Sequence, residues 1–209
     1  MEELDLLKKA WQKDSHSYEQ ISEGEIYKML HKKSSSIVRW ILIISIIEVL
    51  FWAVISVFCD IDEYLTKLHA EVIMVYFRIA NYINYAVILW FIYSFYRNYI
   101  KISTTASTKQ LMHDIIKTRK TVQYYVWYNL IMILVTLVAG FIIDFTYDPI
   151  LRHKLEDENN SFSMWITFGF LLLATIIIVG FFWLFYRLLY GILLRKLNAN
   201  YKELKKIDL

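Results

Sequence analysis

The feature that most constrains this chain is the stretch Ile37–Phe58, 22 residues of almost unbroken apolar sequence. Lys32, Lys33 and Arg39 form a basic group at its start, and its only acid, Glu48, stands near its middle. An α-helix needs roughly 20 apolar residues to cross the ~30 Å hydrocarbon core of a bilayer. The stretch therefore predicts a membrane-spanning helix.

Three further stretches are long and apolar enough to span a membrane. They are Phe77–Tyr96, Val122–Ile143 and Met164–Tyr186. The first of these could begin at Val72, but a start at Phe77 places Arg78 at the interface, where its side chain reaches the headgroups. Of the 209 residues 57% are hydrophobic, more than a soluble domain with a polar surface carries. The sequence predicts an all-α polytopic membrane protein with a four-transmembrane-helix bundle over residues 37–187.

The distribution of basic residues predicts the orientation, because Lys and Arg are retained on the cytoplasmic side. Residues 1–39, 97–121 and 187–209 carry nineteen Lys and Arg, and the two other connections carry three. We therefore expect a bacterial inner-membrane protein with both termini in the cytoplasm. The expected interface anchors are Arg39, Arg78, Arg97 and Arg187. Aromatic residues interpreted as a belt at the inner interface are Trp40, Tyr96, Tyr99, Tyr124, Tyr125, Trp127, Tyr186 and Tyr190.

Residues 1–36 are expected to form a cytoplasmic, capped helical region. Leu4, Leu7 and Trp11 recur at helical spacing and favour a short amphipathic helix, with a solvated tail as the alternative. Further on, Ser22 and Glu25 have the spacing of a capping box, in which each side chain satisfies the other residue's backbone amide. This pattern predicts one helix that begins near Glu23 and continues into the bilayer.

Two more helical extensions are expected on the cytoplasmic side. Ser107 and Gln110 have the spacing of a second capping box, so the third membrane helix should begin near Thr108. Residues 188–209 form a basic, amphipathic C-terminal helix. It either lies against an anionic inner leaflet or is an ordinary basic flank of the last span.

Two pairs of segments resemble each other. Phe91–Arg97 reads FIYSFYR and Phe181–Arg187 reads FFWLFYR, 90 residues later. The entries into the first and third spans also match around His31 and His113. Such self-similarity predicts a duplicated helical hairpin with parallel halves. Coincidence among helices built from few residue types is the alternative.

The polar residues inside the predicted spans are the candidate site. An ionisable group in the membrane is costly, so Glu48 should be protonated and face a partner in the bundle interior. The antiparallel second helix brings Asn84 to the depth of Glu48, and Asn129 lies slightly nearer the cytoplasm. We expect a polar cluster of Glu48, Asn84, Asn129 and Asn81. It is either a proton or ion site or a hydrogen-bonded group that fixes helix packing.

The sequence gives no support for an enzyme. Cys59 is its single cysteine, and none of its five histidines lies in a predicted span. It contains no Gly-rich phosphate loop, no Gly-x-Ser-x-Gly and no His-Glu-x-x-His. We therefore expect no cofactor and no metal.

Residues 25–38 (EIYKMLHKKSSSIV) and 117–122 (KTRKTV) carry a resemblance to a known family. Over its whole length the chain resembles the uncharacterised small four-span membrane proteins of flavobacteria and other Bacteroidota. The resemblance implies the same fold and assigns no role to any matched residue. Such proteins are sometimes named beta-carotene monooxygenase, but that activity needs an iron site of several histidines, which this sequence does not assemble.

Two functions follow as hypotheses. The first is a membrane-anchored scaffold or regulator that binds a cytosolic protein through its inner helices. The second is a small transporter or channel subunit with Glu48 as its intramembrane ionisable site. Membrane lipid is an expected partner, a second copy of the chain is a further candidate, and the net charge of only +3 does not suggest nucleic acid.

Overall fold

A computed structural model describes residues 22–58, 61–105, 107–149 and 161–207. These ranges contain five helices and no strand: α2 (Glu23–Phe58), α3 (Ile61–Lys67), α4 (Glu71–Thr104), α5 (Thr108–Tyr147) and α7 (Ser161–Ile207). Four of them, all except α3, are long and apolar enough to cross a membrane. The predicted all-α four-helix fold is therefore confirmed.

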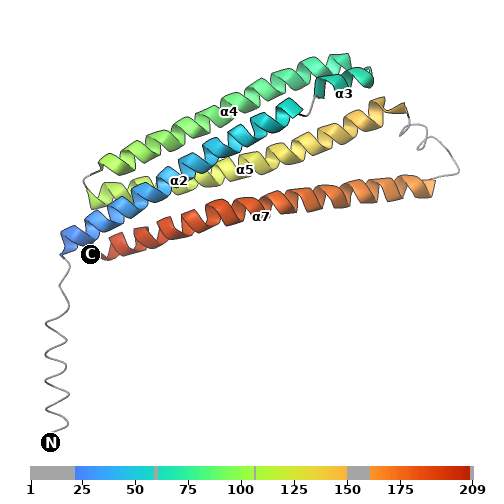
Figure 1. The fold of residues 1–209 in the computed structure, drawn as a ribbon. Coiled ribbons are helices and arrows are strands. Elements are labelled where there is room, and N and C mark those ends of the chain that lie inside the picture. The colour runs from blue at the N-terminus through green and yellow to red at the C-terminus, as the bar shows by residue number, and fades with distance from the viewer. Residues whose placement is uncertain (1–21, 59–60, 106, 150–160, 208–209) are drawn as a thin grey trace, which may run out of the picture.

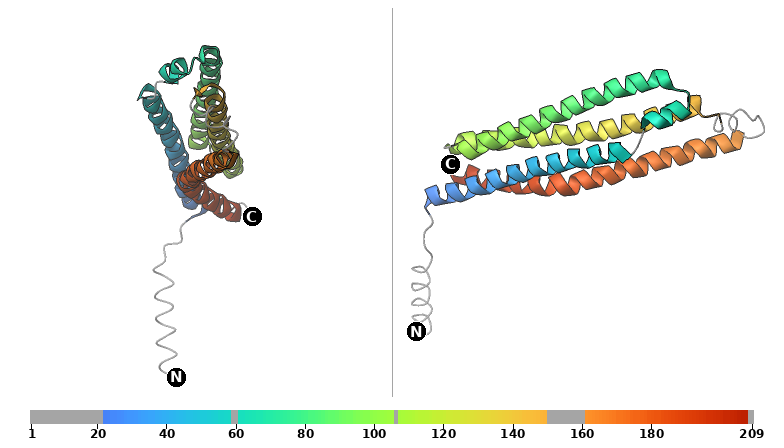
Figure 2. Two further views of the ribbon diagram at one scale, coloured as in Figure 1. Left: turned by 90° about the vertical axis from the view of Figure 1, so that its right-hand side faces the viewer. Right: turned by 45° about the horizontal axis from the view of Figure 1, so that its top comes forward.

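The four long helices lie side by side as an up-and-down bundle (Figure 1). Each packs against two antiparallel neighbours: α2 lies between α4 and α7, and α5 also lies between α4 and α7. The 47 residues of α7 extend over about 70 Å at 1.5 Å per residue, more than twice the ~30 Å bilayer core. The long helices therefore extend beyond the thickness of a bilayer core (Figure 2).

One end of the bundle is strongly basic, and we call it the basic end. It is the end where α2 and α5 begin and α4 and α7 finish (Figure 1). Residues 22–39, 97–121 and 187–207, which build it, carry sixteen Lys and Arg against four Asp and Glu. The long helices converge toward this end (Figure 1).

The capping box at the start of α2 is confirmed. The Ser22 amide donates to Glu25 Oε2 at 3.1 Å, and the Glu25 amide donates to Ser22 Oγ at 3.3 Å. The helix begins at Glu23 and runs without a break through Ser34–Ser36 to Phe58. The predicted amphipathic segment with Leu4, Leu7 and Trp11 lies outside the described residues.

The start of α5 is at Thr108, as predicted, but the second capping box is wrong. Ser107 is the N-cap residue, yet its side chain makes no capping hydrogen bond. The Gln110 amide nitrogen lies 3.4 Å from both carboxyl oxygens of Asp114, one turn further along. The Gln110 side chain thus donates to the buried carboxyl group of Asp114 and does not complete a capping box with Ser107.

The main hydrophobic core lies toward the basic end. Toward this end buried positions recur on each long helix at intervals of mostly three or four residues, as in a packed helical bundle. On α2 and α5 the buried apolar residues in this core are Leu30, Ile37, Val38, Ile41, Leu111, Ile115, Val122, Tyr125 and Leu130, and on α4 and α7 they are Phe91, Phe95, Ile102, Tyr186, Tyr190, Leu197 and Leu204. Seven of these sixteen positions lie outside the predicted spans, and most of the others lie in the halves of the spans nearer the basic end.

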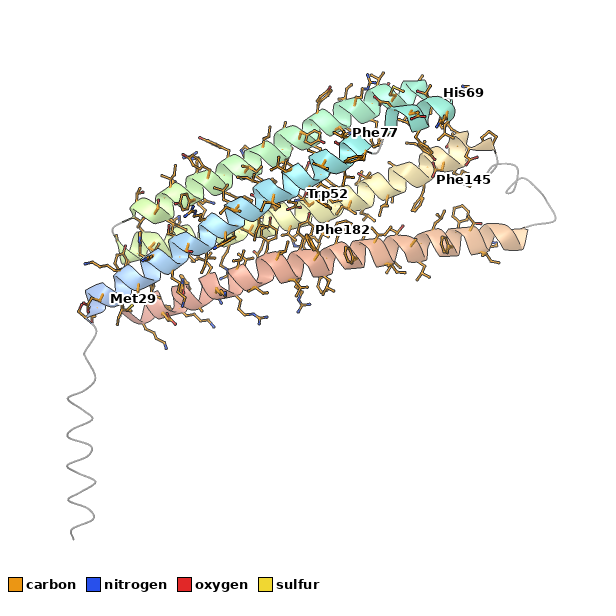
Figure 3. All side chains as sticks on the ribbon, viewed as in Figure 1. Met29, Trp52, His69, Phe77, Phe145 and Phe182 are labelled. Carbon is orange, nitrogen blue, oxygen red and sulfur yellow. The ribbon has the colours of Figure 1, made fainter. Side chains whose placement is uncertain are left out.

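The other end of the bundle has little core and a large apolar surface. Val57 and Phe58 are 81% and 83% exposed, and no described side chain of α7 between Trp165 and Phe185 is buried. Exposed apolar area on this scale is unfavourable in water and marks a surface that another apolar phase covers. In Figure 3 side chains point outward from the helices along this end, between Trp52 and Phe145.

The short helix α3 closes the end opposite the basic end. Leu65 of α3 packs with Ala70 and Ile143 in a second small cluster. The Tyr64 hydroxyl donates to Asp144 Oδ1 at 2.6 Å. His69, which follows α3, has φ of 53°, a left-handed conformation in which glycine is more usual (Figure 3).

Candidate functional site

Glu48 lies on the inward face of α2, where it continues a row of buried positions. Ile41 and Ser45 precede it on that face and are completely buried, and Glu48 itself is 9% exposed. A carboxyl group in such a place needs hydrogen-bond partners, because an unpaired buried polar group costs free energy. The bundle supplies them from two other helices.

Three tyrosine hydroxyls donate to the Glu48 carboxyl group. Tyr125 of α5 and Tyr190 of α7 donate to Oε2 at 2.9 Å and 3.2 Å. Tyr186 of α7 donates to Oε1. Each of the three tyrosines is at most 2% exposed. We call Glu48 with these residues the tyrosine cage.

The rings of the cage are packed among other aromatic rings. Tyr186 and Tyr190 stack with centroids 6.1 Å apart, and Tyr190 meets Tyr125 edge-on at 5.9 Å. Phe91 and Phe95 of α4 each meet the Tyr125 ring edge-on at 5.4 Å. The carboxyl group is therefore enclosed by residues from all four long helices, and its hydrogen bonds hold α2, α5 and α7 together.

The predicted cluster of Glu48 with Asn84 and Asn129 is not formed in the described residues. Asn84 Oδ1 accepts from the Tyr128 hydroxyl at 2.8 Å, and Asn129 Nδ2 donates to the Tyr125 carbonyl of its own helix at 3.0 Å. Asn81 is exposed. The two asparagines thus have other partners, and Tyr hydroxyls on α5 and α7 reach Glu48 instead. The prediction chose partners by polarity and missed hydroxyls carried on aromatic rings.

The partners of Glu48 lie at other positions in their own predicted spans than Glu48 does in its span. Glu48 stands near the middle of the first predicted span, but Tyr186 is the last residue of the fourth predicted span and Tyr190 lies beyond it. Tyr125 is only the fourth residue of the third predicted span. The middle of one apolar stretch therefore lies beside the ends of two others. These tyrosines were interpreted as a surface belt, and they are instead buried.

A second set of polar side chains, buried or half-buried and not predicted from the sequence, lies nearer the basic end. Asn200 Nδ2 of α7 donates to Ser34 Oγ of α2 at 3.0 Å, and both residues are completely buried. Arg119 of α5 donates to Asn198 Oδ1 at 2.7 Å. Asn200 follows Leu197 by three residues and precedes Leu204 by four, a spacing that could have marked it as buried.

The expected interface anchors are found in different surroundings. Arg39 is exposed, and Arg78 forms an ion pair with Asp62 at 2.5 Å. Arg97 lies over the Tyr93 ring, with its guanidinium carbon 5.9 Å from the centroid. Arg187 lies over the Trp183 ring at 4.9 Å. Their role at a membrane boundary stays a prediction.

A hollow of about 140 Å³ lies between α5 and α7, directly outside the tyrosine cage. We call it the α5–α7 groove. Tyr186 and Tyr190, which carry the cage hydroxyls, also line the groove. The other lining residues are Gln123, Val126, Trp127, Trp183, Arg187, Gly191 and Leu194.

A larger, mainly apolar hollow of about 340 Å³ lies between the same two helices at the far end, lined by residues that include Phe141, Phe145 and Phe168. Within the described part of the chain, no group of three or more His, Cys, Asp or Glu side chains is placed to hold a metal ion. The chemistry that the cage offers is therefore that of one carboxyl group and three phenols.

The fold and the site together define a helical-bundle protein with four helices suited to crossing a membrane and one buried carboxyl group held by tyrosines. The chain belongs to the family described as Domain of unknown function (DUF8845), whose match covers residues 24–209. Searches of curated proteins and of solved structures gave no match.

Proposed function

We propose that the chain is a docking protein of the bacterial inner membrane. The apolar parts of its helices anchor it in the bilayer, and the basic end binds an acidic protein in the cytoplasm. The single observation that carries this proposal is the position of the core. A membrane anchor needs only its spans, but here the best-packed residues lie toward the basic end.

The extension of the helices supports a folded module outside the bilayer. Past Tyr186, α7 continues for 21 residues, about 30 Å at 1.5 Å per residue. Leu197 and Leu204 in this extension are completely buried, as are Ile102 of α4 and Leu111 of α5. Four helices that pack this closely present a rigid surface, which suits them to hold a partner at a fixed distance from the membrane.

The charge of the module favours an acidic partner. Sixteen Lys and Arg against four acids give it a positive field, and complementary charge speeds association and selects partners. One of the four acids, Asp114, is buried and does not contribute to the surface. The exposed faces around Lys117 and Lys202 are therefore the proposed docking surface.

Site-specific photo-crosslinking in native cells tests the proposal. A photoreactive residue at exposed Lys117 or Lys202 should give a discrete adduct with one acidic protein, while the same residue at exposed Ile177 should not. Changing Lys202, Lys205 and Lys206 together to Glu should abolish the adduct at Lys117. A matched charge reversal at Lys67, at the other end of the bundle, should leave it intact.

Adducts that form equally at Ile177, or that survive the triple charge reversal, would contradict the docking role. So would a complete lack of protein adducts from Lys117 and Lys202 in cells where the chain reaches the membrane.

A small transporter or channel subunit is the second candidate, and the tyrosine cage is the observation that favours it. Glu48 is a protonatable group inside a helix suited to span a membrane. If it carries a proton or cation, vesicles containing the protein should show a flux that Glu48→Gln abolishes. Equal flux through both proteins, or none through either, would exclude this function.

A further inference from the structure

The α5–α7 groove has the chemistry of a binding site for an anionic amphiphile. Its walls include two large exposed indoles, Trp127 at 62% and Trp183 at 45% exposure. Arg187 brings a positive charge and Gln123 an amide, and both are exposed. Tyr186 and Tyr190 close the groove on the inner side.

Arg187 is available to a ligand. Its guanidinium carbon lies 4.9 Å from the centroid of the Trp183 ring, a cation–π contact that holds the side chain against one wall. None of the ion pairs formed by the described residues involves Arg187. Guanidinium is the side-chain group that best matches phosphate, since it offers paired donors in one plane.

The groove has room because of Gly191. A Cβ atom at this position would contact Arg187 Cγ at 3.8 Å, so any longer side chain would occupy the space beside the arginine. The volume of about 140 Å³ is about ten times the ~10–15 Å³ that one water requires. A phosphate with part of a glycerol group is of suitable size.

The position of the groove indicates an amphiphile rather than a free anion. The stretch Met164–Tyr186 carries no charged residue, and Arg187 is the first charge after it. Beyond the groove, away from the basic end, α5 and α7 expose Ile131, Ile176 and Leu172, which are 52%, 59% and 64% accessible. A headgroup at Arg187 would thus have an apolar surface beside it for acyl chains.

We propose that the α5–α7 groove binds the phosphate of an anionic phospholipid through Arg187, with Trp127 and Trp183 flanking the headgroup. The Glu48 carboxyl group is already engaged by the hydroxyls of Tyr186 and Tyr190, and these two tyrosines line the groove while Glu48 does not. This site does not depend on the proposed docking role of the basic end.

The likeness between Phe91–Arg97 and Phe181–Arg187 supplies a matched control. Arg97 stands four residues after Tyr93, as Arg187 stands four residues after Trp183. Both arginines are exposed and lie over an aromatic ring, but Arg97 lines neither of the two hollows described above. Gly180 is a second control, because it is exposed on the same helix and a Cβ atom there would meet nothing within 4 Å.

Native mass spectrometry of the full chain in detergent tests the site, with phosphatidylglycerol and phosphatidylcholine of the same acyl chains as probes. The protein should retain phosphatidylglycerol selectively. Arg187→Gln should weaken that binding about tenfold or more, the effect of losing charge-assisted hydrogen bonds. Gly191→Leu should weaken it by filling the groove, while Arg97→Gln and Gly180→Leu should bind as the unaltered chain does.

Three outcomes would overturn the proposal. Equal losses in Arg187→Gln and Arg97→Gln would show diffuse attraction to basic residues. Equal retention of the two lipids would show that the net negative charge of the headgroup is not recognised, because both lipids carry a phosphate and only phosphatidylcholine also carries a cation. Displacement of phosphatidylglycerol by equimolar glycerol phosphate would show an anion site that does not require a lipid. The circular dichroism of each variant should match that of the unaltered protein, since all four positions lie outside the buried core.

Discussion

Glu48 is the shared acceptor of three buried hydroxyls, so its loss should affect all three tyrosines at once. A buried donor left without an acceptor costs ~1–3 kcal/mol. Glu48→Ala should therefore lower the free energy of unfolding by about 3 kcal/mol or more. Denaturation of the purified protein in detergent, followed by circular dichroism, measures the change.

Two variants separate the cage from general packing. Glu48→Gln keeps one acceptor oxygen, and phenol hydroxyls can rotate to accept from its amide, so its effect should be clearly smaller. Ser45→Ala, one turn earlier on the same face, removes only a bond from Ser45 Oγ to the Leu42 carbonyl of its own helix. Equal stability of Glu48→Ala and Ser45→Ala would show that the cage contributes little.

At the scale of the helices, the serines that precede α2 and α5 should differ in their effect on stability. Ser22 Oγ accepts from the Glu25 amide, whereas Ser107 makes no capping bond with its side chain. Ser22→Ala should cost about 1 kcal/mol, the usual loss on removing a helix cap. Ser107→Ala should be nearly neutral. Hydrogen exchange of the amides in the first turns of α2 and α5 distinguishes the two, and faster exchange only in α5 would contradict the assignment.

The turn after α3 allows a substitution that should stabilise the fold. His69 has φ of 53°, and its amide and that of Ala70 close the helix end on the carbonyls of Thr66 and Leu65. A residue other than glycine in the left-handed conformation is strained by about 1–2 kcal/mol. Replacement by glycine removes this strain, but the greater flexibility of glycine in the unfolded chain offsets part of the gain in stability. His69→Gly should therefore gain up to about 1 kcal/mol.

Replacement by glycine two residues earlier should lower the stability of the fold instead of raising it. Lys67 is the last helical residue of α3, so Lys67→Gly should lose about 1 kcal/mol. Thermal denaturation of both variants measures the pair. A loss of stability in both would show that the left-handed turn carries no strain.

The helices could be predicted from the sequence because their signals are local. The capping box at Ser22 and the length of Ile37–Phe58 each depend on neighbouring residues only. The partners of Glu48 depend instead on how α5 and α7 are rotated and aligned along α2. Hydropathy does not fix this alignment, since Tyr186 suits an interfacial belt as well as a buried cage. The sequence thus predicted that Glu48 faces the bundle interior, but not which side chains donate to it.

For the whole molecule, the alignment of α2 with α7 can be read from two contacts far apart. Ser34 meets Asn200, and Glu48 meets Tyr186, so 14 residues separate the contacts on each helix. The two helices therefore run antiparallel in constant register, with a polar contact at each level. Buried polar pairs contribute little net stability, but they penalise a shifted register in which they would be unpaired.

The burial of the helices also differs between the two ends of the bundle, and α7 shows this most clearly. Tyr186, Tyr190, Leu197, Asn200 and Leu204 are buried at intervals of three, four or seven residues, the period of a helix with one packed face. Between Trp165 and Phe185 no described side chain is buried. One face of α7 is half-buried there, at positions such as Thr167, Leu171 and Phe182, and the exposed remainder is apolar. Such a helix is stable if the surrounding medium is itself apolar, as in a bilayer.

Spin labels placed one at a time along α7, with the protein in lipid nanodiscs, should therefore report two regimes. Between residues 165 and 185 the accessibility to oxygen should be high, with only shallow dips at half-buried positions such as Leu171 and Phe182, because lipid surrounds most of the helix. From Tyr186 to Leu204 it should fall at every third or fourth residue, because one face enters the core. Dips between residues 165 and 185 as deep as those at Tyr190 and Leu197 would contradict a single chain surrounded by lipid and would indicate that a second copy covers the apolar half.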